Sequence, residues 1–167
     1  ILALPRPIVF KRIIQQLTSL GVGRVYVINA AKVEKSYWES SVITENGWQE
    51  YVRIGLEQAI DTQMVEFCFY RGFKPFMLNT IPEIKQQYRQ LLVAHPKSND
   101  AISGVYESGH GAVLVAIGPE GGWNEFEMEM MKSRGFIDFN IGTRILKVET
   151  AVTAIHAQLS LLQTMAG

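Results

Sequence analysis

The chain has 167 residues, enough for one domain with a buried core, and its 47% hydrophobic and 19% charged residues exclude a disordered protein. Sixteen Lys and Arg side chains balance sixteen Asp and Glu side chains, so a polyanion partner would require a local basic patch. The single cysteine, Cys68, excludes an internal disulfide and suits the reducing environment of the cytoplasm. No apolar run is long enough to span a membrane.

Hydrophobic periodicity and the positions of Gly and Pro predict helices that alternate with strands. The predicted helices span residues 8–20, 45–60, 124–134 and 148–165, with short helical pieces over 72–87. The predicted strands span residues 24–29, 64–70, 90–94, 111–117 and 136–141. The remaining segments are a Pro-punctuated entry at 3–7, a polar loop or short helix at 32–41, and a loop or weak hairpin at 97–111. This alternation predicts an α/β domain with a mostly parallel sheet and flanking helices.

Two glycine turns follow predicted strands, and the rest of the chain is arranged around them. Residues 113–117 lead into a turn at 118–122, and residues 136–141 lead into a second turn at Gly142. Ligands of parallel α/β sheets bind beyond the carboxyl ends of the strands. We therefore expect both turns to line one pocket, together with His95, which ends a third strand.

The first turn, with the sequence G-P-E-G-G at 118–122, is neither a Walker loop nor a dinucleotide-binding G-x-G-x-x-G sequence. Its glycines permit positive φ angles and a close approach of a ligand to the main chain, which suits an adenine or ribose edge better than a triphosphate. By itself this turn is equally consistent with a plain strand–turn–helix connection. The second turn favours a binding site, because Ile145 and Leu146 can form the walls for a flat aromatic ring.

Three charged side chains in or beside these turns are candidate functional groups. Arg144 is suited to bind a phosphate or an anionic base, although its spacing to Glu149 favours a structural ion pair. Glu120 is either a general base within reach of a bound substrate or, more simply, a cap for a backbone amide.

The histidines and the cysteine give no sign of a metal site. His95, His110 and His156 share no metal-ligand spacing with one another or with Cys68, so we predict no metal. His95 either lines the pocket or shapes its loop, and His156 belongs to the core or to an interface. Cys68 lies within a strand pattern, which is typical of an inert packed thiol.

The last helix contains no charged residue from Thr150 to Gly167. A helix without a charged face is usually buried on most of its sides. It therefore runs through the centre of its own domain, or a second copy of the chain covers it, or it simply packs on its own sheet. These interpretations stay open, and we favour a symmetric dimer.

The two turns together resemble the paired cofactor loops of a known enzyme family. The sequence I-G-P-E-G-G-W at 117–123, followed by I-G-T-R-I-L-K-V-E-T-A at 141–151, is similar to that of the RsmE family. These are S-adenosylmethionine-dependent methyltransferases of the SPOUT superfamily, which act on N3 of a uridine in 16S ribosomal RNA of the small subunit. The likeness covers essentially the whole chain. L-T-S-L-G-V at 17–22, E-Q-A at 57–59 and His95-Pro96 are weaker similarities.

The resemblance implies a single SPOUT methyltransferase domain over residues 1–167, with a C-terminal trefoil knot. The residue pattern alone would not suggest the knot, because knots are nearly absent from proteins. The resemblance also implies a homodimer, 16S rRNA in the small ribosomal subunit as partner, and S-adenosylmethionine as co-substrate. The chain starts at Ile1 without Met, and we expect an upstream PUA-like RNA-binding domain outside this sequence.

The family loops transfer to this sequence residue by residue. The implied cofactor-binding residues are Ala94, His95, Ile117, Gly118, Glu120, Gly121, Gly122, Ile141, Gly142, Ile145 and Leu146. Arg144 and Glu149 match the family's R-I-L-R-x-E-T positions and are assigned to target binding and loop ordering. Glu120 and Arg144 are the candidates that help uracil N3 to lose its proton, so the predicted catalytic set is Arg144, Glu120 and Glu149.

The sequence departs from the family pattern on the side expected to face RNA. Lys147 stands where the family often has Arg, Ser19 where Glu is common, and residues 59–63 lack an arginine often found there. Methyl transfer is therefore better supported than the identity of the methylated base. Two alternatives stay open: a SPOUT methyltransferase acting on another RNA such as tRNA, and a non-catalytic domain that binds RNA or a nucleotide.

Overall fold

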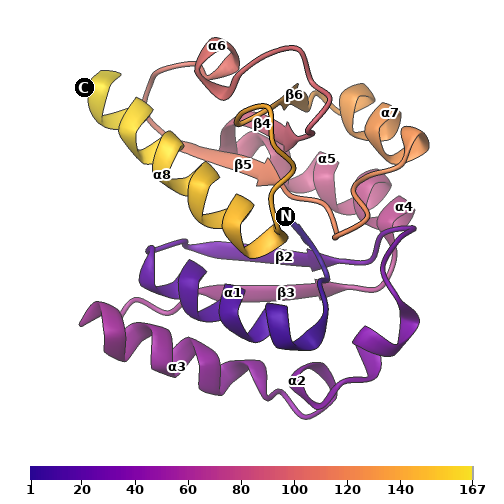
Figure 1. The fold of residues 1–167 in the computed structure, drawn as a ribbon, viewed down its shortest axis with the longest axis vertical. Coiled ribbons are helices and arrows are strands. Elements are labelled where there is room, and N and C mark those ends of the chain that lie inside the picture. Colours follow the sequence, from indigo (N-terminus) through magenta and orange to yellow (C-terminus); the bar gives the residue numbers. More distant parts are fainter. Residues whose placement is uncertain (167) are drawn as a thin grey trace.

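The computed structural model describes the backbone of residues 1–166 and the side chains of residues 1–165 (Figure 1). The strands are β1 (Leu2–Ala3), β2 (Arg24–Ile28), β3 (Glu66–Tyr70), β4 (Tyr88–Ala94), β5 (Ala112–Ala116) and β6 (Ile137–Phe139). The longer helices are α1 (Pro7–Ser19), α3 (Trp48–Ala59), α7 (Glu125–Ser133) and α8 (Val148–Ala166). Short helical segments are η1 (Lys35–Glu39), α2 (Ser41–Thr44), α4 (Phe73–Pro75), η2 (Phe76–Thr80), α5 (Ile81–Ile84), η3 (Lys85–Gln87) and α6 (Ile102–Val105).

Every strand pairing in the described chain is parallel, in two three-stranded groups. The strand orders are β1-β2-β3 and β5-β4-β6. The groups meet where Leu2 forms a parallel bridge to Ile117. There the amide of Ala3 donates to the carbonyl of Ile117 at 3.0 Å, and the amide of Ile117 donates to the carbonyl of Ile1 at 2.9 Å. The predicted α/β fold with a mostly parallel sheet is thus confirmed, with the strand order β3-β2-β1-β5-β4-β6.

Strand β1, at the centre of this order, was absent from the sequence-based prediction. It is only two residues long, so it carries no periodicity, and the prolines that follow it suggested an irregular entry. Both residues are buried, Leu2 at 3% exposure and Ala3 at 0%. Long-range pairing with β2 and β5, rather than local sequence, makes this segment a strand.

Helices α1 and α3 stack on the same side of β2 and β3 (Figure 1). The approach is close at Gly55, where an added Cβ atom would lie 2.7 Å from Cβ of Thr18. The helix predicted over 45–60 begins at Trp48 in the structure, because Asn46 adopts a positive φ of 53° and separates it from α2. The predicted loop over 97–111 contains α6 and a parallel bridge from Ala101 to Asn140, and it forms no hairpin.

Helix α8 lies along the outside of the second strand group, beside β5 (Figure 1). Val152 and Ile155 are buried on its inner side, but Leu161 is 60% and Met165 76% exposed. The interpretation that this helix runs through the centre of the domain is therefore wrong for the single chain. None of the helices within residues 1–166 combines the length and hydropathy that a bilayer-spanning helix needs.

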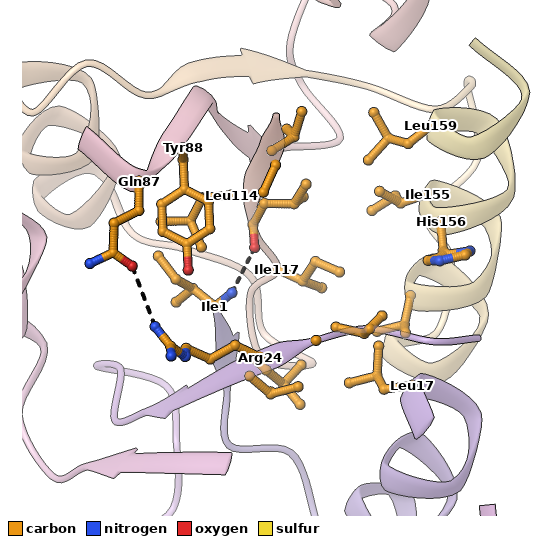
Figure 2. A pocket seen from close by; sticks show the side chains of 18 residues that line it. Ile1, Leu17, Arg24, Gln87, Tyr88, Leu114, Ile117, Ile155, His156 and Leu159 are labelled. Carbon is orange, nitrogen blue, oxygen red and sulfur yellow. Dashed lines mark hydrogen bonds between the residues drawn. The ribbon is translucent and has the colours of Figure 1, made fainter. Parts of the chain in front are cut away.

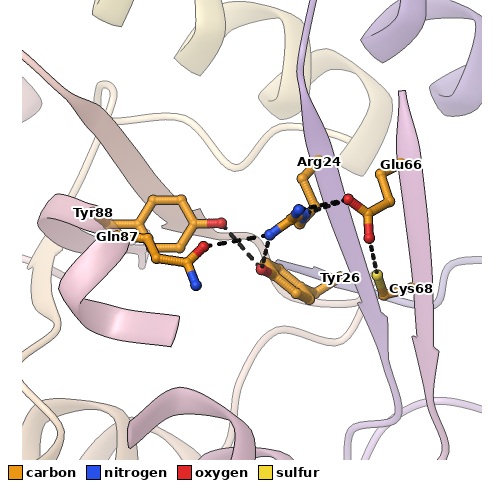
Figure 3. A network of polar contacts seen from close by, with 6 residues as sticks. All are labelled: Arg24, Tyr26, Glu66, Cys68, Gln87 and Tyr88. Atoms are coloured by element: carbon orange, nitrogen blue, oxygen red, sulfur yellow. Dashed lines mark hydrogen bonds and ion pairs between the residues drawn. The ribbon is translucent and has the colours of Figure 1, made fainter. Parts of the chain in front are cut away.

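A polar network links the two strand groups at their amino ends (Figure 3). Arg24 at the start of β2 forms an ion pair with Glu66 at 2.6 Å, and the hydroxyls of Tyr26 and Tyr88 lie 3.2 Å apart. Burial and the hydrogen bond to Tyr26 raise the pKa of Tyr88. Burial also raises the pKa of Cys68, which keeps this thiol protonated and matches its predicted inertness.

Candidate functional site

A pocket of about 330 Å³ opens at the carboxyl ends of β4, β5 and β6. Three segments line it, and each follows one of these strands: residues 94–97, 117–123 and 139–146. Lys32, from the segment after β2, and three residues of α8, namely Val148, Ala151 and Ile155, complete the wall. Because the three strands are parallel neighbours, their ends meet at one edge of the sheet, as the strand–turn pattern predicted.

The pocket contains all eleven residues of the implied cofactor-binding set, and also Arg144. Glu149 belongs to the first turn of α8 but lies outside the lining, between the lining residues Val148 and Ala151. The sequence therefore identified which segments converge. The binding and catalytic roles of these residues stay predictions.

The first glycine turn is a tight turn packed on an indole ring. The amide of Gly122 donates to the carbonyl of Pro119 at 2.8 Å, and Gly122 has a φ of 68°, which L-residues with side chains rarely adopt. An added Cβ atom at Gly118 would lie 3.2 Å from the ring of Trp123, which is 6% exposed. The main chain of this turn thus packs against a buried side chain and lines the pocket.

Contacts from the first third of the chain brace this turn. The carboxylate of Glu120 accepts hydrogen bonds from the backbone amide of Arg6 at 3.2 Å and from its Nε at 3.4 Å. Nζ of Lys32 donates to the carbonyl of Gly121 at 2.7 Å. Glu120 thus caps a backbone amide, as the simpler of its two interpretations held, although the amide belongs to the start of α1 rather than to the turn itself.

Glu127 is a buried carboxylate that fixes the helix following the turn. It forms a capping box with Asn124, with bonds of 2.8 and 2.9 Å. Its second oxygen accepts from the amide of Ala31 at 2.7 Å, and the residue is only 2% exposed. The Asn–Glu spacing signalled the capping box, but no local signal could have revealed the contact with a segment 96 residues away.

The second glycine turn is open by comparison. Its Gly142 has a φ of 133°, and the Gly142 amide donates to Oδ1 of Asn140 at 3.1 Å. Ile145 is 85% exposed, and Arg144 is exposed as well. The structure describes both Arg144 and Glu149, and the two side chains do not form the expected ion pair. That expectation was wrong, because the spacing of the two residues along the chain does not bring their charged groups within ion-pair distance.

The pocket rim is cationic although the whole chain is neutral. Lys32, Lys97 and Arg144 line it, whereas its carboxylate, Glu120, is paired with Arg6. Burial lowers the pKa of His95 below 6.5, against the opposing influence of Asp138, so this imidazole is neutral at pH 7. The sequence analysis did not single out Lys32 or Lys97. Across residues 1–165, no His, Cys, Asp and Glu side chains gather in a group of three that could hold a metal ion.

A second cavity, of about 510 Å³, lies at the amino ends of β4 and β5 (Figure 2). Its walls are mainly aliphatic and come from both strand groups, α1 and the inner side of α8, with Leu17, Leu114, Ile155 and Leu159 among them. Arg24, Tyr88 and His156 stand at its edge. It is larger than the pocket at the strand carboxyl ends, but it contains neither glycine turn and no cluster of charged groups, so volume alone does not identify the functional site.

The chain has a parallel sheet with a pocket at the carboxyl ends of its strands, and its sequence matches a known protein family. Residues 1–160 match the model of the RNA methyltransferase domain, and the chain belongs to that family. It is 27% identical over 157 residues to ribosomal RNA small subunit methyltransferase E of Treponema pallidum, covering 94% of this chain and 59% of that protein. It is 28% identical over 149 residues to methyltransferase E 1 of Borreliella burgdorferi, covering 89% and 60%. The chain thus spans about three fifths of these relatives.

Solved structures show the same fold. The crystal structure of ribosomal RNA small subunit methyltransferase E from Neisseria gonorrhoeae, bound to S-adenosyl methionine, superposes with a TM-score of 0.81 at 22% identity, covering 97% of this chain and 64% of that chain. The SpoU methyltransferase AviRb from Streptomyces viridochromogenes, in complex with AdoMet, gives 0.57 at 13% identity, covering 95% and 59%. The described chain thus has the fold of SPOUT methyltransferases, and the trefoil knot itself stays a prediction.

Proposed function

We propose that this chain is the catalytic domain of an S-adenosylmethionine-dependent RNA methyltransferase that methylates N3 of a uridine in 16S rRNA of the small ribosomal subunit. The observation that carries the proposal is the convergence of residues 94–97, 117–123 and 139–146 on one pocket. The resemblance of the last two segments to the RsmE cofactor loops, and the relatives named for small-subunit rRNA methylation, support it. An rRNA substrate would place the protein in the cytoplasm.

The residues present fit an adenosyl group. The glycines line the pocket with main chain rather than side chains, and at Gly118 and Gly121 an added Cβ atom would come within 3.2 Å and 2.8 Å of neighbouring side chains. Ile117, Ile145 and Leu146 offer apolar walls to an aromatic ring. Apolar walls with a few main-chain polar groups are typical of a nucleoside site.

When bound, S-adenosylmethionine supplies an electrophilic methyl group, so the protein's task is chiefly to position the two reactants. The new N–C bond forms at uracil N3 as the S–C bond breaks, and N3 gives up its proton. Arg144, exposed on the rim and free of Glu149, would stabilise the anionic base by its guanidinium charge. Glu120 remains the candidate proton acceptor, but its bonds to Arg6 reduce its availability. Glu149 would order the loop rather than touch substrate.

The test is cofactor binding followed by methyl transfer. We expect calorimetry to detect S-adenosylmethionine binding, and labelled methyl groups to enter isolated 30S subunits, with mass spectrometry of nuclease digests giving 3-methyluridine. Label in tRNA, or in another base, would move the substrate assignment to a different RNA. Absence of both cofactor binding and transfer would reject the enzyme and leave a binding domain.

We also propose that the enzyme is a homodimer assembled through α8. The outer face of this helix carries Leu161 and Met165, at 60% and 76% exposure, and no charged residue stands from Thr150 onward. Ile155 and Leu159 of the same helix border the apolar cavity at the strand amino ends (Figure 2). An exposed apolar helix face without charged residues resembles the core of a permanent subunit interface.

The dimer is tested by light scattering during gel filtration. We expect the mass of two chains for the natural protein and a shift toward one chain for Leu161→Glu. Ile60→Glu is the control, because Ile60 is 96% exposed and belongs to the end of α3. A natural chain that runs as a monomer at micromolar concentration would contradict the proposal, as would equal effects of the two substitutions.

A further inference from the structure

We infer that Lys32 is a positioning residue that locks the first glycine turn in its binding conformation. The inference rests on the proposed function, because it concerns the pocket assigned there to the cofactor. Three observations carry it: the anchoring of the segment that bears Lys32, its contact with Gly121, and the freedom that two adjacent glycines would otherwise have.

The segment that bears Lys32 is fixed from behind. The amide of Ala31 donates to Oε1 of Glu127 at 2.7 Å, and Glu127 is held in turn by the amide of Asn124. A tight turn closes the segment, with the amide of Val33 donating to the carbonyl of Ala30 at 3.0 Å. The backbone of Lys32 is therefore tied to the start of α7, which immediately follows the glycine turn.

From this base the Lys32 side chain covers the turn. Its stem lies so close to Gly121 that an added Cβ atom there would come within 2.8 Å of Cδ and 3.2 Å of Cβ of Lys32. Its ammonium donates to the carbonyl of Gly121 at 2.7 Å. Since the amide of Gly122 is bonded to Pro119, the peptide group between Gly121 and Gly122 is held at both of its polar ends.

Such a restraint matters at a pair of glycines. Without Cβ atoms, Gly121 and Gly122 can exchange between turn conformations at little steric cost, and each exchange redirects a carbonyl or an amide that lines the pocket. A ligand that binds main-chain groups gains affinity when those groups are already oriented. Lys32 supplies this orientation from outside the turn, so it acts through Gly121 rather than by touching the ligand.

The experiment compares Lys32→Met, which keeps most of the stem and removes the ammonium, with Lys32→Arg, which retains a cationic donor. Lys35→Met is the matched control, because Lys35 is an exposed lysine three residues away that does not line the pocket. Two ligands are titrated by calorimetry: S-adenosylhomocysteine, and 5′-deoxy-5′-methylthioadenosine, which lacks the amino-acid tail. We expect Lys32→Met to weaken both ligands by the same factor, about three- to tenfold, with most of the affinity kept in Lys32→Arg.

Two results would overturn the inference. Weakening of S-adenosylhomocysteine alone would mean that the ammonium contacts the tail directly, and unchanged affinity for both ligands would mean that the contact is dispensable. A readout independent of any ligand is amide hydrogen exchange over residues 118–123, which we expect to be faster in Lys32→Met than in the natural chain or Lys35→Met. If the natural chain binds neither ligand, the proposed function fails, and the exchange rates still decide whether Lys32 holds the turn.

Discussion

The two glycine turns of the pocket look alike in the sequence and differ in the structure. Each follows a parallel strand and each contains a glycine at positive φ, Gly122 in one and Gly142 in the other. The first is braced by Arg6 and Lys32 and rests on a buried indole, whereas the second exposes Ile145 to solvent. The proposed ligand would therefore meet one wall that is already ordered and one wall that the ligand, RNA or a second subunit would order.

This difference separates two kinds of residue. We expect groups that brace the first turn to contribute to folding and to ligand binding together, because the same hydrogen bonds connect the two strand groups. Groups on the second turn have few internal contacts, so their replacement affects ligands and substrates while the free energy of unfolding stays nearly constant. The substitutions below test this separation.

The largest effect is expected on the open turn, from Arg144→Ala. Loss of the only guanidinium on the described rim should lower the rate of methyl transfer about 100-fold, the size typical of a removed electrostatic stabiliser. Stability should change by less than about 0.5 kcal/mol, because Arg144 forms no ion pair with Glu149. Initial rates with labelled cofactor and urea unfolding measure the two quantities. A large loss of stability would show that Arg144 supports the fold instead of acting only on substrate.

On the braced turn, Gly122→Val should weaken cofactor binding at least tenfold. A β-branched residue at a φ of 68° costs about 1–3 kcal/mol of backbone strain, and relief of that strain would reorient the turn. Gly21→Val is a matched control: Gly21 has a φ of 72°, an added Cβ atom there meets nothing within 4 Å, and the residue lies at the end of α1. Both variants should lose similar stability in urea, but calorimetry should show a loss of affinity for Gly122→Val alone.

Glu127→Ala should destabilise the fold by about 2–4 kcal/mol, because it removes a buried carboxylate and leaves the amides of Ala31 and Asn124 without their partner. Glu125→Ala removes an exposed carboxylate from the same helical turn and should cost about 0.5 kcal/mol or less. Thermal and urea unfolding compare the two. Equal costs would show that the contact between α7 and the Ala31 segment does not brace the turn.

The smallest effect is a pH dependence from His95. Its folded-state pKa lies below the unfolded value of 6.5 because burial disfavours the imidazolium, so the unfolded chain binds more protons in that interval. Stability should therefore fall as the pH drops below about 6.5 and level off below the lowered pKa. The measurement is the urea midpoint at pH values between about 7.5 and 5. The decrease in stability over this range should be smaller in His95→Asn than in the natural chain. Part of the decrease should remain in this variant, because burial also lowers the pKa of His156.

Much of the site followed from local sequence. Glycines placed directly after apolar strand-like runs marked where the chain must turn at positive φ, and parallel strands bring such turns to a common edge. The capping box of Asn124 and Glu127 could be read from spacing alone, since it involves one turn of helix. Local spacing gave a wrong prediction for Arg144 and Glu149, because closeness in the sequence does not ensure that two charged groups meet.

What the sequence determined by itself was the set of local elements: the alternation of strands and helices, both glycine turns, and the last helix, which carries no charged residue from Thr150 onward. The tertiary structure decided which distant segments support them. Strand β1, two residues long, became central through pairing with β2 and β5, and Ala31 and Lys32 became part of the site through bonds to Glu127 and Gly121. Apart from the pairing of β1 with β2, these contacts join residues about 90 positions or more apart. No periodicity or spacing encodes them, because they depend on how the whole sheet assembles.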